Sequence, residues 1–246
     1  MNNKIQILKK IAANQEIIGI IGLGYVGLPL AVNFAEARIK VIGFEKSKEK
    51  ADLSNSGTNY NGDIRDAVLR EVVVDTLKLE ATTDCSRMKE CDALIIAVPT
   101  PLDKFRKPDM SYIESACLDI GKNIKAGTFI SLESTTYPTT TEDFMLPIIE
   151  RESGLKQGED FWLAYSPERV DPGNKEFHTR NTPKVLGAMS DDGVEIGEAL
   201  YLKAIDNIYK VSSPRVSEMV KILENTYRLV NISLINELAL LAGKMD

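Results

Sequence analysis

Apolar residues recur along the chain in short runs that alternate with longer amphipathic stretches. Strand-like runs lie at 17–21, 40–45, 93–98, 128–132, 161–165, 184–188 and 208–211. Helical spacing of apolar positions is found within 1–15 and near 63–72, 111–123, 141–152 and 191–204. Strands separated by helices of this length predict an α/β fold with a doubly wound, mostly parallel Rossmann-type sheet. The stretch 1–15 is expected to add a short extra helix before the first strand.

The C-terminal part of the chain carries one long helical pattern. Ser212 and Ser213 followed by Pro214 form a capping signal with proline in the first turn. At about 1.5 Å per residue this helix would be roughly 50 Å long, which is longer than one domain usually needs. We therefore predict a nucleotide-binding domain at 1–212, followed by a long linking helix at 213–246.

A glycine pattern follows the first strand-like run and opens a helical stretch. Its members are Gly22, Gly24, Tyr25, Val26 and Gly27. Gly22 would allow a tight turn, Gly24 would let the backbone approach a diphosphate, and Gly27 would let the helix pack close to the sheet. A helix starting near Tyr25 would direct unpaired N–H groups and its positive dipole end at the same place. The pattern predicts a dinucleotide site that needs no lysine.

Glu45 ends the second strand-like run and is predicted to bind the adenosine ribose. Its carboxylate would accept hydrogen bonds from the ribose diol. It would repel a 2′-phosphate by about 4 kcal/mol at roughly 4 Å with an effective dielectric near 20. NAD is therefore expected as the cofactor, and the adjacent Lys46 would soften the preference over NADP. The alternative is a glycine-rich turn in an α/β protein that binds no nucleotide.

Three further strand-like runs are followed by polar segments. The residues of interest in them are Pro99, Thr100, Ser134, Thr135 and Glu168. Because ligands bind beyond the carboxyl ends of the strands in such sheets, these segments should converge beside the glycine loop. The alternative is that proline and threonine only form turns there.

Lys221 and Asn225 are four residues apart on the long helix and therefore share a face. An ammonium and an amide placed this way can stabilise a developing alkoxide. On spacing alone, a solvated helix face is the alternative.

Composition and charge restrict the function classes. The chain has 246 residues, of which 43% are hydrophobic and 27% charged, with a net charge of -6. These values are typical of a folded globular protein, and the negative charge argues against a nucleic-acid partner. No run reaches the roughly 18 apolar residues that span a bilayer, and the N-terminus lacks the apolar core of a signal peptide. No membrane partner is predicted, and the cytoplasm is the expected location.

Cysteine and histidine content indicates no metal site. Cys85, Cys91 and Cys117 are odd in number and lack C-x-x-C spacing, so neither a disulfide framework nor a zinc site is predicted. We expect them to be small buried hydrophobic residues. His178 is the only histidine, lies in a polar stretch and is given no catalytic role.

Five motifs, in order over essentially the whole chain, resemble those of the UDP-glucose/GDP-mannose dehydrogenase family. They are Gly-x-Gly-Tyr-Val-Gly-Leu-Pro at 22–29, Val-Pro-Thr-Pro at 98–101, Glu-Ser-Thr at 133–135, Ser-Pro-Glu-Arg at 166–169 and Lys-x-x-x-Asn-Thr at 221–226. The continuation Val-Asp-Pro-Gly-Asn at 170–174 resembles the branch that oxidises UDP-N-acetylhexosamines, most closely the UDP-N-acetylglucosamine 6-dehydrogenases. The UDP-glucose branch typically carries Phe-Leu-Arg-Glu after Ser-Pro-Glu, so its second glutamate has no counterpart here.

The resemblance implies NAD-dependent oxidation of the C6 hydroxyl to the acid in two hydride transfers. Lys221 and Asn225 would stabilise the oxygen that becomes negative, and Thr135 and Glu168 would position substrate or a water. Thr100 would line the cofactor cleft. The substrate would be a UDP-N-acetylhexosamine, with UDP-N-acetylglucosamine favoured, although the sequence does not distinguish the gluco from the manno epimer.

The resemblance also implies parts that the chain does not contain. The family's second step uses a cysteine thiolate in a Gly-Gly-His-Cys segment after the long helix, and none of the three cysteines lies in such a segment. The UDP-binding C-terminal domain is missing as well. We therefore expect the chain to be the N-terminal part of a longer enzyme, which binds NAD without turning over nucleotide sugar.

Apolar positions along the long helix predict a homodimer in the full-length protein, with packing on its own domain as the alternative. These positions are Leu223, Leu229, Val230, Leu234, Leu238 and Leu241. Two other functions stay open. One is a single oxidation of the β-hydroxyacid dehydrogenase kind, since those enzymes also join a Rossmann domain to a helix with Lys-x-x-x-Asn. The other is a non-catalytic NAD-binding or dimerisation module.

Overall fold

One eight-stranded sheet organises the chain. The computed structural model describes residues 3–62, 64–169 and 179–245, so His178 and the Val-Asp-Pro-Gly-Asn motif at 170–174 lie outside the described residues. The strand order is β3-β2-β1-β4-β5-β6-β7-β8. All neighbouring strands are parallel except β6 and β7, which are antiparallel. The predicted doubly wound, mostly parallel Rossmann-type sheet is confirmed.

The strands follow the predicted apolar runs closely. They are β1 (Ile17–Ile21), β2 (Lys40–Phe44), β3 (Leu79–Thr82), β4 (Ala93–Ile96), β5 (Thr128–Leu132), β6 (Phe161–Tyr165), β7 (Lys184–Ala188) and β8 (Ile208–Lys210). The sequence did not predict β3. It is short, and its burial alternates along the strand.

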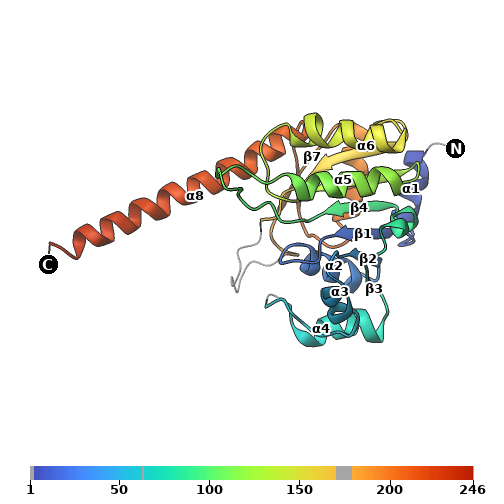
Figure 1. Ribbon diagram of the computed structural model, residues 1–246, viewed down its shortest axis with the longest axis horizontal. Coiled ribbons are helices and arrows are strands. Elements are labelled where there is room, and N and C mark those ends of the chain that lie inside the picture. The colour runs from blue at the N-terminus through green and yellow to red at the C-terminus, as the bar shows by residue number, and fades with distance from the viewer. Residues whose placement is uncertain (1–2, 63, 170–178, 246) are drawn as a thin grey trace.

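Helices cover both faces of the sheet (Figure 1). They are α1 (Asn3–Ala12), α2 (Gly27–Glu36), α3 (Lys48–Asn55), α4 (Asp66–Arg70), α5 (Ser111–Asn123), α6 (Leu146–Ser153), α7 (Asp191–Tyr201) and α8 (Pro214–Ala242). Short π or 3-10 segments are η1 (Glu71–Asp75), η2 (Cys85–Glu90) and η3 (Thr140–Met145). α2 begins at Gly27 rather than near Tyr25, and α3 was not predicted, because only Ala51 and Leu53 give it an apolar side.

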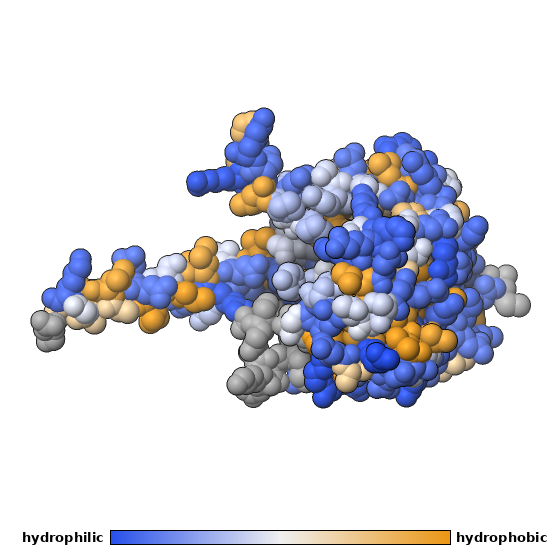
Figure 2. Space-filling view, turned by 60° about the horizontal axis from the view of Figure 1, so that its bottom comes forward, coloured by the Kyte–Doolittle hydropathy of each residue, from blue (hydrophilic) through white to orange (hydrophobic). Residues whose placement is uncertain are grey.

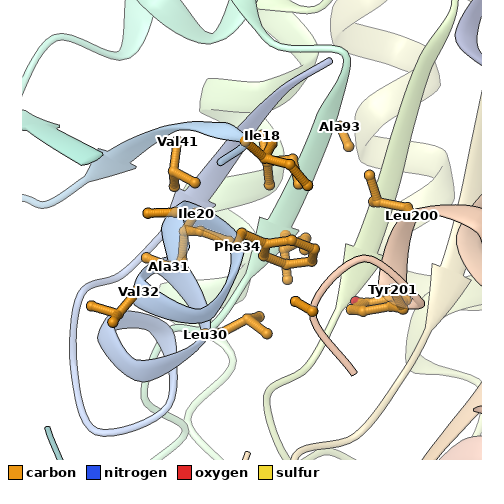
Figure 3. Close-up of a cluster of buried hydrophobic side chains, with 14 of the residues drawn as sticks. Ile18, Ile20, Leu30, Ala31, Val32, Phe34, Val41, Ala93, Leu200 and Tyr201 are labelled. Carbon is orange, nitrogen blue, oxygen red and sulfur yellow. The ribbon is translucent and has the colours of Figure 1, made fainter. Parts of the chain in front are cut away.

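The core has one apolar cluster on each face of the sheet. Figure 3 shows the cluster in which Ile18 and Ile20 of β1 face Phe34 of α2 and Tyr201 of α7. The second cluster packs α5 and α6 against the other face. Residues of β1, β4 and β5 alternate between the two clusters, which explains why these strands are continuous apolar runs.

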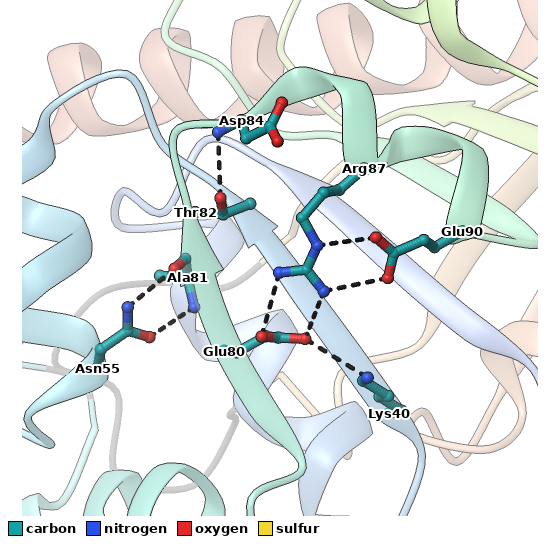
Figure 4. A network of polar contacts seen from close by, with 8 residues as sticks. All are labelled: Lys40, Asn55, Glu80, Ala81, Thr82, Asp84, Arg87 and Glu90. Carbon is teal, nitrogen blue, oxygen red and sulfur yellow. Dashed lines mark hydrogen bonds and ion pairs between the residues drawn. The ribbon is translucent and has the colours of Figure 1, made fainter.

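Polar contacts hold the edge strand β3 in place (Figure 4). The side chain of Asn55, at the end of α3, accepts from the Ala81 N–H at 2.7 Å and donates to the Ala81 carbonyl at 2.8 Å. Arg87 forms ion pairs with Glu80 and Glu90, both at 2.8 Å. Side chains of α3 and η2 thus bind β3, which is an edge strand and, among the described residues, has no neighbouring strand on its outer side.

Helix α8 extends away from the sheet (Figure 1). The Ser213 side chain accepts from the Val216 N–H and Pro214 stands in the first turn, so the predicted start of this helix is confirmed. Only the first turns contain buried residues. The six apolar positions considered for a dimer are all exposed, between 49% and 66%, and Figure 2 shows apolar side chains along the projecting helix. The alternative that they pack on their own domain is therefore wrong for the described chain.

Candidate active site

The glycine loop joins β1 to α2 in a conformation that only glycine allows. Gly22 has a φ of +93°, and a Cβ there would lie 2.8 Å from the Ala97 carbonyl oxygen. A Cβ on Gly27 would lie 1.9 Å from the Gly22 carbonyl oxygen. At both positions neighbouring backbone atoms leave no room for a side chain. Gly24 is different, because a Cβ there would meet nothing within 4 Å. The loop is thus packed on its inner side and open at Gly24.

Glu45 is hydrogen-bonded to the loop. Its Oε2 accepts from the Leu23 N–H at 3.1 Å, and its Oε1 accepts from the Ser47 N–H at 3.0 Å. Two oxygens offer about four acceptor positions, so the carboxylate keeps capacity for a ribose diol. The Lys46 ammonium does not turn toward this carboxylate. It donates to Ser115 Oγ on α5 at 2.7 Å.

A cavity of about 510 Å³ lies along the loop. Its lining includes Gly24, Tyr25, Val26, Glu45, Lys46 and Pro99. This volume lies within the roughly 300–1,000 Å³ typical of ligand sites. Among the described residues no side chain caps the start of α2, so its positive dipole end faces the loop without a capping side chain, although the Leu28 N–H already donates to the Gly24 carbonyl at 3.1 Å. The open position at Gly24 and this uncapped helix start fit the diphosphate of a dinucleotide. Glu45 lines the same cavity, and its role at the ribose stays a prediction.

The polar segments after β4 and β5 meet beside this cavity. The Thr100 hydroxyl donates to the Thr135 carbonyl at 2.8 Å, and the Ser134 hydroxyl donates to the Val98 carbonyl at 2.7 Å. The side chain of Thr135 itself is exposed. These two segments therefore meet as predicted. Val98 and Pro99 line the cavity, whereas Thr100, Ser134 and Thr135 are not among the residues that line it, and their contact with the cofactor stays a prediction.

Helix α8 brings Lys221 to the segment after β6. The Lys221 ammonium donates to the Glu168 main-chain carbonyl, and burial lowers the pKa of this lysine. The neighbouring ion pair between Arg169 and Glu224, at 2.5 Å, binds the same segment to the same helix. Asn225 lies one turn beyond Lys221 and is exposed. The structure thus joins Lys221 to the Glu168 segment and leaves the amide of Asn225 open to solvent.

A buried polar cluster lies beneath this segment. The Lys184 ammonium is 2.8 Å from Glu133 Oε2, and the Tyr201 hydroxyl donates to Glu133 Oε1 at 2.8 Å. Lys184 also donates to the Pro167 carbonyl at 3.3 Å and lies 3.9 Å from Glu168 Oε2. All three members are at most 4% exposed. Burial raises the pKa of Glu133, against the opposing effect of Lys184.

Three residues with structural roles near the site, Lys184, Tyr60 and Glu218, were not predicted from the sequence. Lys184 opens a buried apolar strand, and a lysine at such a position is a signal that could have been used. Tyr60, whose hydroxyl donates to the Leu23 carbonyl at 3.0 Å, lies in a polar stretch without periodicity. Glu218 gave no signal, because its partners lie 77 and 79 residues away.

Of the three cysteines, only Cys85 lies at the cofactor cavity. All three are free, Cys91 and Cys117 are buried, and burial raises the pKa of both thiols to about 12. Cys85 lines the cofactor cavity, and burial raises its pKa as well. In the described part of the chain, no group of acidic, histidine and cysteine residues could hold a metal ion.

The fold and the site define a Rossmann-type dinucleotide-binding protein. Residues 16–205 match the NAD binding domain of the UDP-glucose/GDP-mannose dehydrogenase family, and residues 215–246 match the central domain of that family. The chain belongs to this family, and NAD as its cofactor is confirmed. The family match is evidence against the β-hydroxyacid dehydrogenase alternative. The division into domains at residue 212 stays a prediction.

Relatives and solved structures agree with this assignment. The chain is 38% identical, over 229 residues, to a UDP-N-acetyl-D-glucosamine 6-dehydrogenase from Pseudomonas aeruginosa, covering 93% of this chain and 53% of that protein. It is 36% identical, over 226 residues, to a UDP-N-acetyl-D-mannosamine dehydrogenase from Pyrococcus horikoshii, covering 92% and 53%. It superimposes on an NDP-N-acetyl-D-galactosaminuronic acid dehydrogenase from Methanosarcina mazei with a TM-score of 0.85 and 35% identity, covering 98% and 53%.

The chain therefore spans about half the length of the curated relatives it matches. Within the described residues, no helix combines the length and the apolarity that crossing a membrane would need.

Proposed function

We propose that this chain supplies the cofactor site and part of the catalytic site of an NAD-dependent dehydrogenase that acts on a nucleotide sugar. The reaction is oxidation of the C6 hydroxyl of a UDP-N-acetylhexosamine to the uronic acid in two hydride transfers. UDP-N-acetylglucosamine is the favoured substrate. Because the relatives are about twice as long, the complete reaction is proposed for a protein that also carries the remaining half. The 246 residues alone are expected to bind NAD and to leave nucleotide sugar unchanged.

The observation that carries this proposal is the contact between Lys221 and the Glu168 segment. A helix outside the sheet places an ammonium at the carboxyl end of β6, at the same edge of the sheet as the loops after β1 and β4 that line the cofactor cavity. Substrate bound there would be near both the nicotinamide and a cation. The names of the relatives supply the substrate class, since those of Pseudomonas aeruginosa and Pyrococcus horikoshii act on UDP-N-acetylhexosamines.

Each side chain has a defined task in this proposal. When bound, NAD would supply the hydride acceptor. The ammonium of Lys221 and the amide of Asn225 would donate hydrogen bonds to the C6 oxygen as it becomes negative, which stabilises the transition state. The hydroxyl of Thr135 and the carboxylate of Glu168 would orient the substrate or a water. The backbone of Gly24, Tyr25 and Val26 would hold the diphosphate, with Ser134 and Thr100 lining the nicotinamide side.

The stoichiometry of the reaction tests the proposal. A protein carrying these residues and the remaining half of the relatives' length is incubated with NAD and UDP-N-acetylglucosamine, and NADH is counted per sugar consumed. Two NADH per sugar supports the double oxidation. One NADH indicates a single oxidation. No NADH, with NAD binding retained, indicates a non-catalytic module. A parallel incubation with UDP-N-acetylmannosamine decides between the epimers.

Location and assembly complete the proposal. Exposed apolar side chains along α8 support a homodimer through this helix in the longer protein. If a second copy buries this surface, light scattering should give the mass of a dimer.

NAD and nucleotide sugars are cytoplasmic metabolites, and we propose that the protein acts in the cytoplasm.

A further inference from the structure

Tyr60 contacts the glycine loop from behind. It lies between α3 and α4, and its hydroxyl donates to the Leu23 carbonyl at 3.0 Å. The Leu23 N–H donates to Glu45 Oε2 at 3.1 Å. Leu23 has no exposed surface, so the loop is held at this residue on both its N–H and its C=O sides. Two residues from distant segments therefore fix one turn of the cofactor loop.

The peptide bond between Leu23 and Gly24 needs this support. The next carbonyl, that of Gly24, accepts from the Leu28 N–H at 3.1 Å, a contact of helical spacing that belongs to the start of α2. The following peptides are thus set by the helix, whereas the Leu23–Gly24 peptide precedes it. Glycine restricts its own backbone little, and the surroundings of Gly24 are open. The hydrogen bond from Tyr60 is therefore the described contact that fixes the orientation of the Leu23–Gly24 peptide itself.

The direction of the peptide follows from its planarity. In a trans peptide the C=O and the N–H point in opposite directions. With the Leu23 C=O directed at Tyr60, the Gly24 N–H points away from Tyr60. In the described structure Tyr60 lines a neighbouring cavity of about 380 Å³ and is not among the residues that line the cofactor cavity. The hydrogen bond of Tyr60 thus reaches the loop through its backbone at Leu23.

We propose that Tyr60 is a positioning residue for the NAD diphosphate, which orients the Leu23–Gly24 peptide so that the loop presents N–H groups to the bound phosphates. This inference rests on the NAD site of the proposed function and adds a residue outside the glycine motif to it. Nothing in the glycine motif itself fixes this peptide.

The electrostatics of Tyr60 suit a permanent donor. Burial and the nearby Glu45 carboxylate raise the pKa of Tyr60 to about 12. The phenol therefore keeps its proton, and with it the hydrogen bond to Leu23, over the pH range in which enzymes work. Asn61 adds a weaker contact, since its Nδ2 lies 3.5 Å from the Gly24 carbonyl oxygen.

Removing the hydroxyl alone tests the inference. Tyr60→Phe keeps the ring, and Tyr227→Phe, at an exposed position on α8, is the matched control. We expect Tyr60→Phe to bind NAD about tenfold more weakly by calorimetry, because one buried hydrogen bond is lost. Binding of adenosine, which lacks the diphosphate, followed by NMR should change less than twofold. Tyr227→Phe should match the parent with both ligands.

Two results would overturn the inference while leaving the proposed function intact. One is an NAD affinity of Tyr60→Phe within twofold of the parent. The other is an equal loss for NAD and adenosine, which would indicate a general effect on the fold. A parent chain that fails to bind NAD would overturn the proposed function together with this inference.

A second variant covers the case in which Tyr60→Phe folds poorly. A fluorinated tyrosine incorporated at position 60 keeps the hydroxyl and lowers its pKa. NAD affinity of this variant should then fall as the pH rises through the titration of the fluorinated phenol, while the parent stays constant over the same range. An affinity that does not depend on pH in the variant would contradict the role of the Tyr60 proton.

Discussion

Glu218 of α8 holds Thr141 of η3 in a buried contact. Glu218 Oε1 accepts from the Thr141 N–H at 2.9 Å and from its hydroxyl at 2.7 Å, and Oε2 accepts from the Thr139 N–H at 2.6 Å. Glu218 stands three and seven residues before Lys221 and Asn225, spacings that share one helix face. This carboxylate therefore sets the position of the proposed catalytic face relative to the nucleotide-binding sheet.

Loss of the Glu218 carboxylate should destabilise the protein. Glu218→Ala leaves the N–H groups of Thr139 and Thr141 without their acceptor, in a buried place. We expect the free energy of unfolding in urea to fall by about 1–3 kcal/mol. Glu237→Ala, at an exposed position further along α8, is the control and should change it by less than about 0.5 kcal/mol. Equal effects of the two variants would mean that the contact contributes nothing.

The same carboxylate predicts a pH dependence of stability. Burial raises the pKa of Glu218 above its ordinary value of 4.5, against the opposing hydrogen bonds from Thr141 and Thr139. Between that value and the raised one, the folded chain binds more protons than the unfolded chain. Protonation of Glu218 therefore contributes to the free energy of unfolding. This contribution is fully present below pH 4.5 and is lost as the pH rises through the pKa of Glu218 in the folded chain.

Urea unfolding of the parent and of Glu218→Gln at several pH values measures this effect. The advantage of the parent over Glu218→Gln should shrink as the pH rises from about 4 to about 8. An advantage that grows over this range would show that the folded pKa is lowered instead.

Much of the fold could be predicted because its strands are buried on both faces. The runs 128–132, 161–165 and 184–188 are strands with the predicted bounds, since burial on both sides requires a continuous apolar run. β3 and α3 were missed for the opposite reason. Glu80 interrupts the strand, and α3 carries few apolar positions, so neither has the periodicity that burial produces.

The site likewise contains residues whose positions could be predicted and residues whose positions could not. The segments at Thr100 and Thr135 could be placed together because the carboxyl ends of parallel strands share one edge of a sheet. Tyr60, Lys184 and Glu218 could not be placed. Their partners are decided by how loops and helices pack, at separations of 37, 51 and 77 residues. Hydrogen bonds of this kind leave no periodic trace in a sequence.

Glu45→Ala should weaken NAD binding more than NADP binding. The substitution removes the proposed ribose acceptor, and it also frees the Leu23 and Ser47 N–H groups that the carboxylate binds. NAD affinity should fall roughly tenfold to a hundredfold, as expected for a charge-assisted hydrogen bond. NADP should lose less, because its 2′-phosphate escapes the repulsion of a carboxylate. Calorimetry with both cofactors measures this, with Glu36→Ala as the control, and equal losses would remove the ribose role.

The buried pair of Glu133 and Lys184 should show strong coupling in a double-mutant cycle. Glu133→Gln leaves a buried ammonium, and Lys184→Met leaves a buried carboxylate, so each should cost about 3–5 kcal/mol of unfolding free energy. The double variant removes both charges and should cost clearly less than the sum. Lys48→Met, which breaks the exposed ion pair with Asp52, should change stability by less than about 1 kcal/mol. If the losses of the two single variants add up in the double variant, the predicted coupling between Glu133 and Lys184 is absent.

Lys221→Ala should lower kcat far more than it raises KM in a protein that carries the complete catalytic site. The Lys221 ammonium is held at the Glu168 carbonyl and does not contact the glycine loop, so NAD binding should be unchanged. Loss of a donor to a developing oxyanion lowers kcat by roughly a hundredfold to a thousandfold. Steady-state kinetics with saturating NAD measure both parameters, and Lys122→Ala on the exposed side of α5 is the control. A rise in KM with unchanged kcat would mean that Lys221 binds substrate and transition state equally, and it would then have no part in the chemistry.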